Sequence, residues 1–204
     1  MKNNRIVLAI TGASGAVYGL LLCKELLRAG RELTLLISKA GFQVLKKETG
    51  LDWQGEASEV TAKIREYFGG SGEACFAPTY FADDDFMAPF ASGSSAPAAM
   101  VICPCTMGTV GRIASGLSST LIERTADVML KERRPLVLVP RETPLSEIHL
   151  ENLLKLARAG ARIVPAMPAF YHQPESVDDM VNFVVGKVLD QLGIEHDLFR
   201  RWGS

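Results

Sequence analysis

The chain has 204 residues, the length of one ordinary domain, and its composition of 48% hydrophobic and 22% charged residues is globular rather than disordered. Lys and Arg number 22 and Asp and Glu 23, giving a formal net charge of -1, so the basic excess of a nucleic-acid-binding protein is absent. The sequence has no apolar run of about 18 residues, no signal-peptide core and no disulfide framework among its four cysteines, so we expect a cytoplasmic protein without a membrane span.

Strands and helices alternate along the chain in the hydrophobic pattern. The N-terminal half predicts strands at residues 6–11 and 32–37 and helices at 16–29, 40–48 and 59–68. Residues 69–97 form the least regular part of the chain. The C-terminal half predicts strands at 99–103, 135–139 and 161–165 and helices at 121–132, 147–159 and 177–192, the last after a Ser176–Asp179 pair spaced as a capping box. This alternation predicts a single three-layer α/β domain over residues 1–204, Rossmann-like or flavodoxin-like, with a mostly parallel sheet.

The loop after the first strand is rich in small residues, at the sheet edge where parallel α/β domains bind ligands. It reads Gly-Ala-Ser-Gly at residues 12–15, and the next helix directs its free N–H groups toward it. A phosphate group fits such a loop, while a plain tight turn is the alternative. The glycines do not follow the G-x-G-x-x-G spacing, and Ser38 with Lys39 ends the second strand where an NAD site needs an acidic residue. The pattern therefore favours a mononucleotide over a dinucleotide.

The third strand end, at Cys103 to Cys105, continues into small and hydroxyl-bearing residues that could line a flat ring. Two thiols without a nearby His or further Cys do not make a zinc site. The acidic run at residues 83–85 lacks the last acid of the D-D-x-x-D magnesium-diphosphate motif, because Met87 stands there, and a solvated loop is the simpler interpretation. The three histidines are scattered in sequence. We therefore expect no metal site.

Charged residues gather in the second half of the chain. Arg124 and Lys131 are seven residues apart, on one face of a predicted helix, and Arg141 and Glu142 directly follow a buried strand. Surface salt bridges are the ordinary explanation for such charges. The place of the second pair at the ligand-binding edge instead predicts a proton-transfer group, Glu142, beside an anion-binding arginine.

Taken together, these residues resemble the UbiX-type flavin prenyltransferases, within the larger group of flavin-dependent cysteine decarboxylase-like proteins. The resemblance runs in order along nearly the whole chain. It rests on residues 11–19, 36–40, 91–97, 100–105, 121–124, 131–142 and 168–171. It implies FMN bound at the carboxyl edge of the sheet in a homo-oligomer, commonly a dodecamer, with sites at subunit interfaces.

The resemblance also implies that reduced FMN and dimethylallyl phosphate are the substrates and that no metal takes part. The dimethylallyl group would join flavin N5 and then C6, and the prenylated FMN would pass to a separate UbiD-type decarboxylase. The implied FMN contacts are Gly12, Ala13, Ser14, Ser38, Thr106, Met107, Gly108, Thr109, Arg124 and Arg141. The implied contacts to the allylic phosphate are Lys131, Arg141, Tyr171 and Lys187. The implied catalytic residues are Glu142 for proton transfer, Glu48 for ring formation, and Ser14, Lys131 and Tyr171.

Two residues depart from the family pattern. Phe86 stands where some members have Trp, and Lys187 stands where other members have Arg, which keeps the charge without the bidentate fork. Two other functions stay open. A related FMN-dependent decarboxylase of cysteine-containing or pantothenoyl compounds would by resemblance carry an early catalytic histidine, whereas the first histidine here is His149. A non-catalytic flavin carrier would give no reason for the charged residues above to converge.

Overall fold

One parallel sheet organises the chain. The computed structural model describes residues 4–69 and 77–203, and Cys75 lies outside them. The strand order is β3-β2-β1-β4-β5-β6, which is the Rossmann order, and every strand pairing among the described residues is parallel. The strands are β1 (Arg5–Ile10), β2 (Glu32–Ile37), β3 (Thr79–Phe81), β4 (Ala99–Cys105), β5 (Leu136–Pro140) and β6 (Arg162–Ile163). The predicted α/β class is therefore confirmed.

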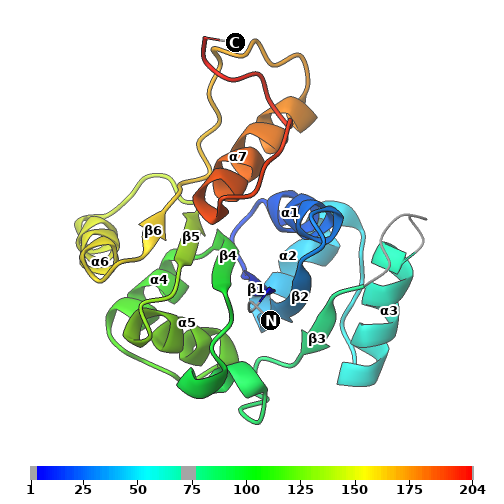
Figure 1. Ribbon diagram of the computed structural model, residues 1–204, viewed down its shortest axis with the longest axis vertical. Helices are drawn as coiled ribbons and strands as arrows, with labels where there is room; N and C mark the ends of the chain where they lie inside the picture. The colour runs from blue at the N-terminus through cyan, green and yellow to red at the C-terminus, as the bar shows by residue number, and fades with distance from the viewer. Residues whose placement is uncertain (1–3, 70–76, 204) are drawn as a thin grey trace.

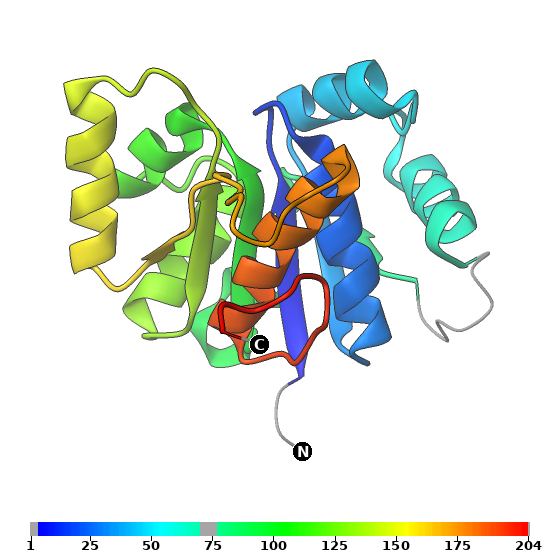
Figure 2. The ribbon, with the colours of Figure 1, turned by 90° about the horizontal axis from the view of Figure 1, so that it is seen from above.

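Helices cover both faces of the sheet and complete three layers (Figures 1 and 2). On one face, α1 (Ala16–Arg28), α2 (Lys39–Thr49), α3 (Ala57–Gly69) and α7 (Val177–Leu192) share a hydrophobic core with the strands. On the other face, α4 (Met107–Ala114), α5 (Leu121–Lys131) and α6 (Glu147–Arg158) build a second core with the short turns η1 (Pro89–Ala91) and η2 (Gly93–Ser95) nearby. The sheet therefore has an apolar layer on each face.

Burial explains why the central strands are continuous apolar runs. In β1, every residue from Ile6 to Ile10 is buried, and in β4 all residues from Ala99 to Cys105 are. A strand packed on both faces shows no polar alternation, since neither face meets water. No helix among the described residues is both long and apolar enough to cross a membrane.

One strand and one α-helix were not predicted from the sequence. Strand β3 lies within the segment judged least regular, and it has only three residues, paired with β2 at the edge of the sheet. Helix α4 contains Gly108, Thr109 and Gly111, which are weak helix formers. It forms because Thr106 caps it and because Val110 and Ile113 bury its apolar face.

Helix α7 packs on the sheet beside α1, while the segments on either side of it extend away from the sheet. Figure 1 shows the loop between β6 and α7, together with the C-terminal segment, projecting past the sheet. Ser176 begins α7 with the predicted capping box, in which its hydroxyl accepts from the Asp179 amide at 3.1 Å and Asp179 accepts from the Ser176 amide at 2.9 Å. Helix α7 therefore has a defined start.

Candidate active site

The site lies at the carboxyl edge between β1 and β4, where the strand order reverses and Rossmann-type sheets leave a crevice. Thr11, at the end of β1, connects the two sides of this crevice. Its hydroxyl donates to the Pro104 carbonyl at 2.8 Å and accepts from the Thr106 amide at 2.9 Å. The loops after β1 and β4 are thereby fixed to each other, although sequence reasoning gave Thr11 no role in the site.

The N-terminus of α1 receives a carboxylate of the chain itself. Glu48, near the end of α2, accepts from the amides of Gly15 and Ala16, both at 2.9 Å. The N-cap Gly15 offers no side chain for this purpose, and its φ of 109° is a conformation that glycine adopts without strain. Glu48 therefore occupies the place at the start of α1 where the sequence suggested a phosphate.

Ser14, Glu48 and Arg141 form one polar cluster. Arg141 donates from Nε to the Ser14 carbonyl at 3.1 Å, and its own amide donates to the Cys105 carbonyl at 3.4 Å. Partial burial acts to raise the pKa of Glu48, but hydrogen bonds from the Ser14 hydroxyl and the two amides, with the Arg141 charge, outweigh it and lower the pKa. Glu48 is therefore ionised at neutral pH.

The α2 side of the crevice is packed closely. A Cβ on Gly12 would lie 2.5 Å from the Ala40 Cβ, so only glycine lets the β1 loop approach α2 this closely. Ser38 caps α2 by accepting from the Gly41 amide at 3.0 Å, and Ala13 is buried. The residues predicted here are therefore adjacent to the cluster, with the Ser38 hydroxyl already used as a cap.

The loop after β4 becomes the start of α4. Thr106 is its N-cap, and Thr109 is buried directly above the core. Met107 points into the core and is 5% exposed, so its side chain is not available to a ligand. Gly108 is exposed at the surface of this turn. Of the four predicted contacts, Met107 can take part only through its backbone.

Glu142 and Arg124, two further predicted charges, lie apart from each other. Glu142 is exposed beside Arg141 and accepts from the Thr143 amide at 3.1 Å. Arg124, early in α5, donates to the Ala91 carbonyl at 2.9 Å and pairs with Asp127. Of these two residues, only Glu142 is next to the Ser14 cluster.

Lys131 lies on the side of the sheet where β5 begins, and Arg141 lies on the side where β5 ends. It ends α5, just before β5 begins, and pairs with Glu132 at 2.6 Å. Arg141 follows the other end of β5, whose five residues span roughly 16 Å at the usual rise per strand residue. One chain therefore does not bring these two predicted phosphate contacts together.

Tyr171 and Lys187 both lie at α7. The Tyr171 ring packs edge-on against Phe183 of α7 and against Trp202, at centroid distances of 5.8 and 5.3 Å. Lys187 is one helical turn beyond Phe183 and pairs with Asp190 at 3.6 Å. One predicted contact, Lys187, is therefore part of α7, and the other, Tyr171, packs against it.

The thiols at the end of β4 are buried and inert. Burial raises the pKa of Cys105 to about 12, and it raises the pKa of Cys103 even further from its ordinary value. Neither thiol is a nucleophile at neutral pH. Across residues 4–69 and 77–203, no His, Cys, Asp or Glu residues cluster in a way that could hold a metal ion.

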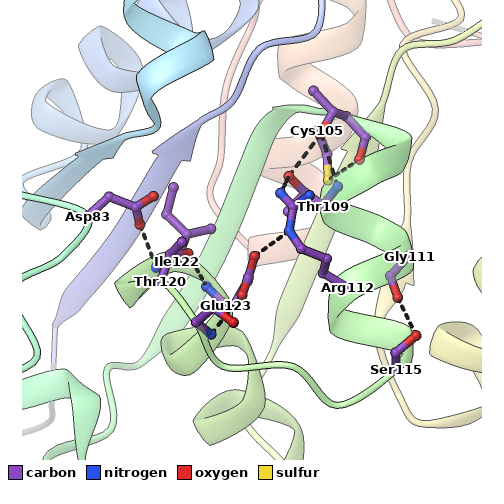
Figure 3. Close-up of polar contacts among 11 residues, drawn as sticks. Asp83, Cys105, Thr109, Gly111, Arg112, Ser115, Thr120, Ile122 and Glu123 are labelled. Atoms are coloured by element: carbon purple, nitrogen blue, oxygen red, sulfur yellow. Dashed lines mark hydrogen bonds and ion pairs between the residues drawn. The ribbon is translucent and has the colours of Figure 1, made fainter.

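The acidic run at residues 83–85 lies in a loop, as interpreted from the sequence, and Asp84 is exposed, but the expectation of a solvated side chain is wrong for Asp83. It follows β3, is partly buried, and its carboxylate accepts from the Ile122 amide at 2.9 Å at the start of α5 (Figure 3). Burial, together with the charges of Glu123 and Asp84, raises its pKa to about 6 despite that hydrogen bond. The signal in the sequence was weak, because the partner amide is 39 residues away.

Replacing Asp83 with asparagine is expected to change how stability depends on pH. An aspartate whose pKa is raised on folding stabilises the fold below pH 4 relative to neutral pH, and this contribution is lost as the pH rises through about 6. Asparagine keeps the acceptor without the charge. The free energy of unfolding of the variant, relative to that of the wild type, should therefore increase by roughly 1–2 kcal/mol between pH 4 and pH 7. Urea unfolding at both pH values measures this, and a pH-independent difference would contradict it.

Comparisons with known proteins place the chain in a family. The profile of the Flavoprotein family matches residues 1–189. The chain is 54% identical over 200 residues to "Flavin prenyltransferase UbiX" of Pseudomonas aeruginosa, covering 98% of this chain and 94% of that protein. It is 44% identical to the protein of the same name from Methanocaldococcus jannaschii, covering 98% and 99%.

Solved structures agree with this placement. AnUbiX (PadA1), in complex with FMN and dimethylallyl pyrophosphate, matches with a TM-score of 0.85 at 42% identity, over 100% of this chain and 99% of that one. A dodecameric FMN-dependent UbiX-like decarboxylase from Escherichia coli O157:H7 has a TM-score of 0.85 at 41% identity, over 98% and 100%. With this fold, this coverage and these identities, the chain belongs to the Flavoprotein family and, within it, to the UbiX flavin prenyltransferases.

Proposed function

We propose that this chain transfers the dimethylallyl group of dimethylallyl phosphate to N5 and C6 of reduced FMN, giving prenylated FMN. The observation that carries the proposal is the cluster of Ser14, Glu48 and Arg141 at the β1/β4 crevice, beside Glu142. The names of its relatives, and a structural neighbour in complex with FMN and dimethylallyl pyrophosphate, support the same assignment.

The donors at the crevice suit FMN. The hydroxyl of Thr106, the guanidinium of Arg141 and the exposed glycine at 108 offer hydrogen bonds and space along one edge, while the Ser14 hydroxyl already donates to Glu48. Because the Glu48 carboxylate fills the N-terminus of α1, we place the FMN phosphate beside Arg141 and the later loops rather than at that helix. Reduced FMN supplies the nucleophilic nitrogen and carbon of the reaction.

Arg141 and Glu142 have complementary roles in this proposal. Loss of an allylic phosphate builds negative charge on its oxygens, which the fixed guanidinium of Arg141 stabilises. Glu142, exposed at the next position, moves a proton at the phosphate or the flavin. Glu48, held ionised by Ser14 and Arg141, assists ring formation. A monophosphate bound by side-chain cations needs no magnesium cage.

The complete site needs more than one chain. Lys131 and Arg141 lie at opposite ends of β5, Lys187 is part of α7, and Tyr171 packs against α7. If all four contact one phosphate, neighbouring subunits must supply some of them. This supports a homo-oligomer, and the dodecameric neighbour supports twelve subunits. We further propose a cytoplasmic protein whose product is passed to a UbiD-type decarboxylase.

Mass spectrometry of the flavin tests the function. The purified protein is mixed anaerobically with reduced FMN and either dimethylallyl phosphate or the diphosphate, and the flavin is extracted. A flavin heavier by one five-carbon unit, formed faster from the monophosphate, supports the proposal. An unmodified flavin with intact FMN binding would favour a decarboxylase or a flavin carrier instead.

A further inference from the structure

We propose, on the basis of the prenyltransferase function above, that Arg112 and Glu123 are positioning residues that fix the Thr106 hydroxyl as a hydrogen-bond donor to an oxygen atom of bound FMN. Figure 3 shows part of this connection, which joins α5, α4 and the end of β4. Neither Arg112 nor Glu123 was predicted from the sequence to have a role in the site.

The connection begins at a buried carboxylate. Glu123 is 1% exposed, yet both of its oxygens are bound: Oε1 accepts from Arg112 Nε, and Oε2 accepts from the Ser119 amide at 2.8 Å. The Arg112 side chain is 49% exposed, so only the carboxylate is removed from water, and the guanidinium and the Ser119 amide compensate for its burial. Because Nε serves the carboxylate, the other guanidinium nitrogens are left for a second contact.

Arg112 reaches back along α4 toward its N-terminus. Side chains on a helix lean in that direction, and Arg112 Nη2 donates to the Thr109 hydroxyl at 3.4 Å. The Thr109 hydroxyl lies 2.9 Å from that of Thr106, which also accepts from the Thr109 amide at 3.0 Å. A continuous series of contacts thus runs from Glu123 to the first residue of the loop after β4.

Burial and charge decide which of the two hydroxyls donates the hydrogen bond between Thr109 and Thr106. A hydroxyl has one proton to donate and two lone pairs to accept with. Thr109 is 4% exposed, so its proton needs an acceptor within the protein, and the Arg112 cation repels that proton toward Thr106. The Thr106 oxygen then accepts twice from Thr109, through its hydroxyl and its amide.

Thr106 is left with only its proton to offer. Its side chain is partly exposed at the crevice, and its amide is held by Thr11. The hydroxyl therefore donates outward, to water in the free protein or to an acceptor on a bound ligand. FMN has three kinds of oxygen acceptor, the ring carbonyls, the ribityl hydroxyls and the phosphate, and any of them satisfies this donor.

Affinity for oxidised FMN, measured by fluorescence quenching, tests the proposal without any turnover. Arg112→Leu/Glu123→Leu is expected to weaken FMN binding about tenfold, which is the scale of one hydrogen bond. Arg112→Lys, which keeps the charge beside Glu123, should recover part of the affinity. A control double variant, Arg28→Leu/Glu25→Leu, removes an equal pair of charges 2.8 Å apart on α1 and should bind FMN normally.

A double-mutant cycle separates positioning from a general structural effect. Thr106→Val should weaken FMN binding by the same factor, and the Arg112/Glu123 change should add nothing in that background. Thr109→Val breaks the connection without touching the ion pair, so it carries the test if the double variant does not fold. Additive losses, or a folded Arg112→Leu/Glu123→Leu protein that binds FMN as the wild type does, would overturn the proposal.

Riboflavin, which lacks the phosphate, identifies the acceptor. A loss of affinity that persists for riboflavin assigns the Thr106 donor to a ring carbonyl or a ribityl hydroxyl, and a loss confined to FMN assigns it to the phosphate. Since these are binding measurements, they stand even if no prenyl transfer is found, and the flavin-mass experiment fails or succeeds independently of them.

Discussion

Replacing Glu142 with glutamine is expected to lower the rate of prenyl transfer by about 10²–10⁴-fold while FMN binds normally. Glutamine keeps the size and the acceptor that the Thr143 amide uses at 3.1 Å, but it cannot take up a proton. Glu142 is exposed and adjacent to Arg141, so the change removes proton transfer without disturbing the packing of β5.

Single-turnover formation of prenylated flavin, with FMN occupancy measured in parallel, checks this expectation. Glu151→Gln provides a matched control, because Glu151 is also an exposed carboxylate, on α6. Unchanged turnover in Glu142→Gln at full FMN occupancy would remove Glu142 from the mechanism.

Replacing Arg141 with alanine is expected to affect both FMN affinity and turnover. The side chain donates to the Ser14 carbonyl at 3.1 Å, and its charge helps to keep Glu48 ionised. Its loss releases the β1 loop and removes the cation nearest the expected phosphate. We expect FMN binding to weaken about 10–100-fold, the scale of a charge-assisted hydrogen bond, with a further fall in rate.

Arg141→Lys distinguishes charge from geometry. Lysine restores the positive charge but not the planar fork, so it should recover part of the rate and less of the affinity. Arg65→Ala, on the exposed surface of α3, controls for removal of an arginine. Normal FMN affinity in Arg141→Ala would mean that Arg141 does not hold the flavin loop.

The central strands and most helices could be predicted from sequence because their signals are local. Continuous apolar runs mark β1 and β4, and the Ser176–Asp179 spacing marks the start of α7. Strand β3 could not be predicted, since a three-residue edge strand exists only through its pairing with β2. Helix α4 could not be predicted either, because its glycines disfavour a helix that capping and burial then impose.

The site was predictable as a set of strand-end residues but not as a geometry. Glu48 reaches Gly15 across 33 residues of sequence, and no local pattern shows that it would cap α1. The pair of Arg112 and Glu123 is likewise visible only once α4 and α5 are packed together. Residue identity therefore indicated the chemistry, while the fold decided which carboxylate meets which amide.

Complementation between two inactive variants tests the central claim, that one site is completed by residues from different chains. Lys131→Ala and Arg141→Ala chains are co-expressed in equal amounts, and prenyl transfer is compared with each variant alone. If the two residues of a site come from different chains, roughly one quarter of the sites in mixed oligomers hold both intact residues, so about that fraction of wild-type activity returns. If both come from the same chain, no site is intact. Mixed oligomers as inactive as the separate variants would contradict the account.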